Sequence, residues 1–163
     1  MVERDYIMRM IDQLARLLTK ILFNKETKNY AEAFAEIDRA FSGIVGLDHN
    51  LIKNFSSGDI IRLLEFSDKE TVRAKCIVTA KLLKERADLK FMINNDDPDI
   101  SGEYIKALDL FLNSILVNQG KMIELDSYYS DVREITGKLH DSELSEDLKN
   151  KLKQFDQLTE SNS

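Results

Sequence analysis

The stretch "NYAEAFAEIDRAF" (residues 29–41) is echoed by a second stretch, "EYIKALDLFLNSI" (residues 103–115). Each has a Tyr, an Ala three residues later, and large apolar residues at helical spacing beyond it. Aligned on Tyr30 and Tyr104, the matched pairs are Ala33 with Ala107, Phe34 with Leu108, Ile37 with Phe111, and Phe41 with Ile115. The echo predicts either a repeated helix within a stacked fold or two amphipathic helices that match by chance.

The composition around these stretches favours helices throughout the chain. With 163 residues, the length predicts one domain, residues 1–163, with a frayed tail from about residue 159. Hydrophobic residues make up 43 % of the sequence, which is typical of a globular protein. A single Pro and six Gly are too few for the many turns that a strand-rich fold needs. The sequence therefore predicts an all-α protein.

Periodicity and capping residues place about seven to eight helices. Expected N-caps are Ser56 or Ser57, Ser67 (in a capping box with Glu70) and Ser101, and Gly46 is an expected C-cap. The last helix has an apolar stripe along one side, and we expect it to cap the helical stack. Its predicted contacts are Met122, Leu125, Val132 and Ile135. The helices are expected at about 3–24, 28–45, 48–55, 56–66, 67–93, 102–118, 120–139 and 143–158.

The second copy of the echo resembles the second half of a tetratricopeptide (TPR) repeat. In that motif a Gly-x-Tyr turn precedes a helix with a small Ala, and Gly102, Tyr104 and Ala107 fit these places. In the first copy Tyr30, Ala33 and Ala40 fit, but Lys28 replaces the Gly. The bulky aromatic followed by Leu-Gly of the repeat's first helix is missing, so groove positions cannot be carried over.

The chain as a whole also resembles a known family. The opening "ERDYIMRMIDQLARLLTKIL", the Y-x-E-A pattern at residues 30–33 and "GLD" at residues 46–48 resemble a TPR-like family of unknown function from Gram-positive bacteria. The resemblance implies antiparallel helix pairs stacked as a right-handed array. It implies no activity, cofactor or catalytic residue.

The distribution of charge argues against two classes of partner. The net charge is −6, and residues 101–163 carry twelve acidic and seven basic residues. Nucleic-acid binding and docking on anionic lipid both require a basic surface, so neither partner is expected. Charged residues interrupt the apolar N-terminal segment every three or four positions, which excludes a membrane span of roughly 20 residues.

Other residues give little support to catalysis or metal binding. Cys76 is the only cysteine and lies in the apolar stretch "AKCIVTA", so we expect a buried thiol in a reducing cytoplasm. The stretch "DPDISG" at residues 97–102 matches the first half of a calcium loop, but Leu108 stands where the bidentate Glu should be. Neither histidine lies in a catalytic motif. We expect no enzyme activity, no cofactor and no metal.

The remaining candidates are partner-binding residues. Arg73 and Lys84 lie on the most basic predicted helix, which is either a solvated face or one side of a groove for an acidic peptide. Tyr128 and Tyr129 are adjacent, so we expect one in the core and the other as an exposed anchor. These patterns predict a non-catalytic cytoplasmic adaptor or scaffold that binds a protein or peptide. The alternative is a self-assembling structural protein that forms a homodimer through its helical faces.

Overall fold

The computed structural model describes residues 2–117 and 125–161. This part of the chain forms eight α-helices and no strand, which confirms the all-α prediction. None of these helices combines the length and the apolar run that a membrane span requires. The helices are α1 (Val2–Glu26), α2 (Tyr30–Ala40), α3 (His49–Asn54), α4 (Ser57–Leu64), α5 (Lys69–Ile93), α6 (Asp99–Val117), α7 (Tyr129–Lys138) and α8 (Glu146–Ser161).

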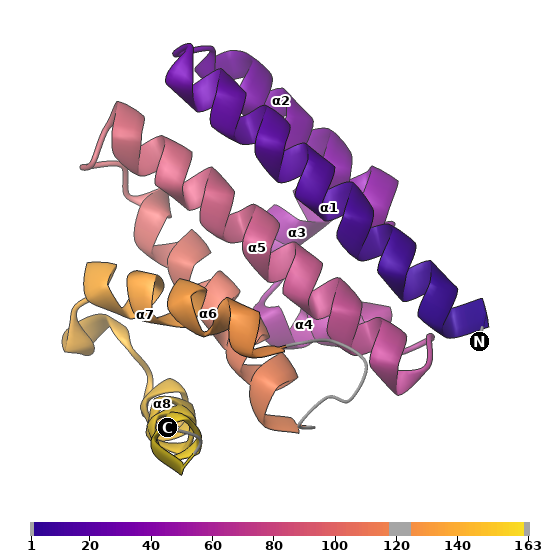
Figure 1. The fold of residues 1–163 in the computed structure, drawn as a ribbon. Helices are drawn as coiled ribbons and strands as arrows, with labels where there is room; N and C mark the ends of the chain where they lie inside the picture. The colour runs from indigo at the N-terminus through magenta and orange to yellow at the C-terminus, as the bar shows by residue number, and fades with distance from the viewer. Residues whose placement is uncertain (1, 118–124, 162–163) are drawn as a thin grey trace.

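Helix α5 occupies the middle of the molecule (Figure 1). It contacts α1 and α2 on one side, and α6 folds back along it on the other. The short helices α3 and α4 connect the α1–α2 pair to α5, and α7 and α8 pack against α6. The α5–α6 contact is the most extensive between any two helices of the described residues. The core is therefore built around α5.

The two echoed stretches become α2 and α6, the second helices of two packed pairs. Both small residues of the echo, Ala33 and Ala107, are fully buried, because a methyl group lets the paired helix approach closely. The larger matched residues also face the core. Those buried are Ile37, Phe41, Tyr104, Leu108, Phe111 and Ile115, and Tyr30 and Phe34 are partly buried. The repeated pattern thus marks equivalent inward-facing sides of two helices.

The turns that end the first two helical segments use left-handed backbone. Lys28 has a φ of 58°, and it stands where the second copy of the echo has Gly102. Gly102 itself lies inside α6, so it does not form the turn that the TPR resemblance assigns to it. Gly46, with a φ of 88°, ends a π-helical turn at Phe41–Val45. Its predicted role as a C-cap is confirmed.

The predicted cap of α5 is wrong by one residue, and the predicted start of α6 is wrong by three. Asp68, rather than Ser67, caps α5, because its carboxylate accepts the backbone N–H of Thr71 at 3.0 Å. α6 begins at Asp99 instead of after Ser101. Ser56 caps α4 as predicted, with its hydroxyl accepting the N–H of Asp59.

In the C-terminal part, the helix boundaries differ from the predicted ones. Residues 120–124 of the predicted helix 120–139 lie outside the described residues, and the described remainder is a 3₁₀ turn at Leu125–Tyr128 followed by α7. α8 starts three residues later than expected and continues to Ser161, through positions predicted to fray. It packs mainly on α6 rather than on the helix before it. Of its predicted contacts, Met122 and the side chain of Leu125 lie outside the described part.

Candidate functional site

The two basic residues predicted to bind a partner are enclosed within the fold. Arg73 is 6 % exposed, and its Nη1 lies 2.9 Å from both carboxylate oxygens of Glu70. Lys84 is 4 % exposed and faces carboxylates from α5 and α7. The expected solvated face is therefore wrong at these two positions, because α5 is central and its neighbours surround it. Partner binding by Arg73 and Lys84 stays a prediction.

Lys84 belongs to a charged cluster that joins α5, α6 and α7. Its Nζ lies 2.7 Å from Glu134, 3.2 Å from Asp88 and 3.5 Å from Asp131. Burial alone lowers the pKa of Lys84, but the hydrogen bond to Glu134 and the charges of Asp88 and Asp131 raise it well above its ordinary value. The cluster thus holds α7 in place by paired charges.

Asp88 is the second centre of this cluster. It accepts a hydrogen bond from the hydroxyl of the buried Tyr104, and Nζ of Lys138 lies 3.0 Å from its Oδ1. Burial raises the pKa of Asp88, but the hydrogen bond from Tyr104 and the charge of Lys84 outweigh it, so the net pKa is lowered. The carboxylate therefore stabilises the fold in its ionised form.

We expect Asp88 to make stability depend on acid pH. Because its folded pKa is lowered, its contribution is complete above the unfolded value of about 3.9 and is lost as the pH falls below it. Asp88→Asn should lower the melting temperature at neutral pH and flatten the fall in stability between about pH 5 and pH 2. Thermal melts across this range measure both effects. Asp12→Asn, at an exposed position of α1, is the control and should leave the profile unchanged.

The two adjacent tyrosines both pack within the chain. The ring of Tyr128 stacks on Phe111 of α6 with centroids 6.1 Å apart, and the ring of Tyr129 meets Phe155 of α8 edge-on at 5.2 Å. Both are partly buried, so neither is the exposed anchor that the sequence predicted. Each tyrosine is covered by a different helix, because Tyr128 meets a ring of α6 and Tyr129 meets a ring of α8.

In the described part of the chain, neither the cysteine nor the half calcium loop forms a reactive or metal-binding site. Cys76 is buried, and burial raises the pKa of its thiol to about 12, which suppresses the reactive thiolate. In the half calcium loop, Oδ1 of Asp97 accepts the N–H of Asp99 and so starts α6. Among the described side chains, no group of three or more His, Cys, Asp or Glu is placed to hold a metal ion.

Large apolar side chains are exposed at one end of the molecule. The C-terminal ends of α1 and α5 lie at this end (Figure 1), and Lys25 joins them by an ion pair of 2.6 Å with Glu85. Leu22 and Phe23 lie near the end of α1, and Met92 and Ile93 close α5. All four are more than half exposed. We call these four residues the apolar end.

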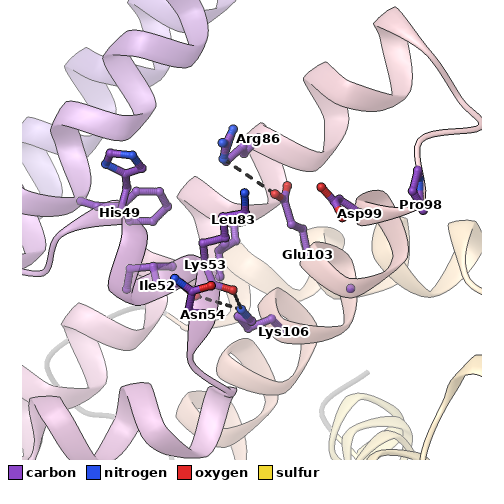
Figure 2. Close-up of a pocket in the computed structure, with 12 residues that line it drawn as sticks. His49, Ile52, Lys53, Asn54, Leu83, Arg86, Pro98, Asp99, Glu103 and Lys106 are labelled. Carbon is purple, nitrogen blue, oxygen red and sulfur yellow. Dashed lines mark hydrogen bonds and ion pairs between the residues drawn. The ribbon is translucent and has the colours of Figure 1, made fainter.

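A separate, charged cavity lies between α3, α5 and α6 (Figure 2). Its volume is about 270 Å³. His49 and Lys53 reach it from α3, Arg86 from α5, and Glu103 and Lys106 from α6. Nζ of Lys106 donates to the backbone carbonyls of Ile52 and Lys53 at 2.8 Å and 3.1 Å, which holds the end of α3 against α6.

No pattern in the sequence predicts this cavity. Glu103 and Lys106 are three residues apart and so share one face of α6, but such pairs are common on helix surfaces. What makes them a site is α3, which contributes carbonyls and Lys53 from more than 40 residues upstream. The spacing of residues within one helix does not predict that contact.

Comparison with known proteins identifies a family and nothing more specific. No curated protein and no solved structure matches the chain. One family model, described as a family of unknown function (DUF6483), matches residues 1–157. That match covers nearly the whole chain, so the protein belongs to the DUF6483 family of unknown function.

Proposed function

We propose that this protein is a non-catalytic interaction module, an adaptor or scaffold, and that its protein partner docks on the apolar end. The exposure of Leu22, Phe23, Met92 and Ile93 carries the proposal. Large exposed apolar side chains gathered at one end of a folded protein commonly mark an interaction site, because covering them removes apolar area from water. Phe23, at 62 % exposed, offers the aromatic anchor that such interfaces favour.

We further propose that the helix pairs stack in a TPR-like, right-handed array in a cytoplasmic protein of Gram-positive bacteria. Support for the stacking comes from α1 and α5, which contact each other and run in the same direction (Figure 1), as first helices of successive pairs do. The free, buried thiol of Cys76 is consistent with a reducing compartment.

The test compares partner capture by the protein and by a variant of the apolar end. Phe23→Ser combined with Ile93→Ser should abolish capture of a specific protein from a lysate of the native cell, because both apolar anchors are lost. Met8→Ser is the control, since Met8 is similarly exposed near the other end of α1. Identical captured proteins with both variants would show that the apolar end is not the docking surface.

The second candidate function is self-association, and the same surface favours it. If the apolar end is a homodimer seam, light scattering should give twice the monomer mass at high concentration. The Phe23→Ser, Ile93→Ser variant should then be monomeric under the same conditions. A strict monomer at every concentration would remove this alternative and leave a different protein as the partner.

A further inference from the structure

Phe66 is the most exposed large apolar side chain among the described residues. It is 94 % exposed, whereas the next, Phe23, is 62 % exposed. Phe66 lies in the turn between α4 and α5, at the N-terminal end of α5. The apolar end lies at the other end of that 25-residue helix, about 37 Å away at 1.5 Å per residue (Figure 1). An aromatic ring buries about 150–250 Å² when it is covered, so Phe66 offers apolar contact area that its own fold does not use.

A second cavity opens beside Phe66. Its volume is about 640 Å³, and it lies between α4, α5 and α6. Its lining is apolar at Ile61 and Val72 and polar on the side of α6. Glu65 and Ser67 line the cavity but Phe66, which stands between them in the chain, does not, so its ring projects from the rim. An apolar cavity of about 150 Å³ accommodates benzene, so a Phe ring fits into this larger one.

The rim of this cavity carries one charge of each sign. Glu65 and Lys69 both line it, both are exposed, and neither forms an ion pair with a described residue. Phe66 lies between them in the sequence. The projecting ring, the cavity and two charges without a counterion therefore share one small area of the surface.

Such a surface is complementary to a second copy of itself. A two-fold axis between the ring and the cavity places the ring of each copy over the cavity of the other, so that both contacts form at once. A ring and a cavity on different faces would instead join copies into an open filament. Charges of opposite sign on the rim also suit a second copy, because each chain then supplies the counterion that the other lacks.

We propose that two copies of this protein form a closed, two-fold dimer in which Phe66 of each copy enters the second cavity of the other. Glu65 of each copy pairs with Lys69 of its partner across the interface. The surface lies at the opposite end of α5 from the apolar end, so the dimer leaves both apolar ends free. The dimer does not rest on the proposed function, which uses the apolar end alone.

The area of this contact determines how strong the dimer is. Two rings bury about 300–500 Å², and the cavity walls that cover them bury a similar area. The total lies below the roughly 1,200 Å² at which stable interfaces begin. The dimer should therefore form at micromolar concentrations or above, and dilute protein should be monomeric.

Light scattering and sedimentation over a range of concentrations test the proposal. The native protein should pass from the mass of a monomer to that of a dimer as its concentration approaches the millimolar range. Phe66→Ser should stay monomeric, and it should still fold because the ring is exposed. Phe23→Ser combined with Ile93→Ser should dimerise as the native protein does, which distinguishes this dimer from association through the apolar end. A native protein that remains monomeric, a Phe66→Ser variant that dimerises, or a mass that grows beyond the dimer would overturn the proposal.

Charge exchange tests the pairing across the interface. Glu65→Lys and Lys69→Glu should each weaken self-association by about tenfold, because like charges then face each other in both halves of the dimer. An equimolar mixture of the two variants should dimerise as the native protein does, because each Lys then meets a Glu of the other chain. Arg39→Gln, at an exposed position of α2, is the control and should change nothing. If the mixture associates no better than either variant alone, the two-fold arrangement is wrong.

Discussion

Replacing Ala107 with Arg is expected to unfold much of the protein at room temperature. Ala107 is fully buried in α6, the helix that makes the most extensive contact with α5. A longer side chain there overpacks the interface, at about 1–3 kcal/mol, and its charge has no partner in the core, which costs several kcal/mol more. Together these costs approach the whole stability of a typical domain, about 5–15 kcal/mol.

Urea and thermal unfolding measure this effect. The control is Ala15→Arg, which makes the same chemical change at an exposed position of α1 and should leave the midpoint almost unchanged. If the Ala107→Arg variant has the same melting temperature as the native protein, the close approach of α5 and α6 at Ala107 does not stabilise this helix pair.

Removal of α8 is expected to have the second largest effect. Leu148 and Phe155 bury one side of this helix, and Lys151 reaches Asp109 of α6 at 2.7 Å. A chain ending after His140 keeps α7 and its bonds to Asp88 but uncovers the apolar surface of α6 and the ring of Tyr129. At about 25 cal/mol per Å², the burial lost is worth several kcal/mol.

The shortened chain should therefore melt at a lower temperature and dimerise or aggregate in light scattering. A matched pair of point variants separates lost packing from shortened length. Phe155→Ala should cost about 3–5 kcal/mol, because Phe155 is 1 % exposed. Phe66→Ala should cost almost nothing, because Phe66 is 94 % exposed. A monomeric truncation with an unchanged melting temperature would show instead that α8 is a detachable arm.

Much of the fold could be predicted because the signals are local. The echoed Ala and aromatic positions lie on the buried sides of α2 and α6, and Gly46 ends its helical segment as its freedom at positive φ suggests. Competing local donors and acceptors caused the errors. Asp68 competes with Ser67 for the cap, and its ionised carboxylate forms the stronger hydrogen bond.

The binding residues were harder to predict because they depend on contacts between helices. Lys84 has the sequence context of a surface lysine, and its burial is compensated by Asp88 on its own helix together with the carboxylates of α7. Tyr129 is covered by α8, which starts 17 residues later in the chain. In the sequence, nothing distinguishes Arg86 from the other basic residues of α5. In the structure, Asp38 and Glu103 lie close to it on two other helices.

The central position of α5 restricts how this protein can change during evolution. Arrays of repeats lengthen by duplicating a unit, because each unit contacts only its immediate neighbours. Here α1, α2, α4 and α6 all contact the same 25-residue helix, so neither half has a core of its own. Loss of the α1–α2 pair would uncover one side of α5, and loss of α6 would uncover the other. Substitutions at exposed positions and in the connecting loops should therefore be tolerated more readily than the loss of any helix that packs on α5.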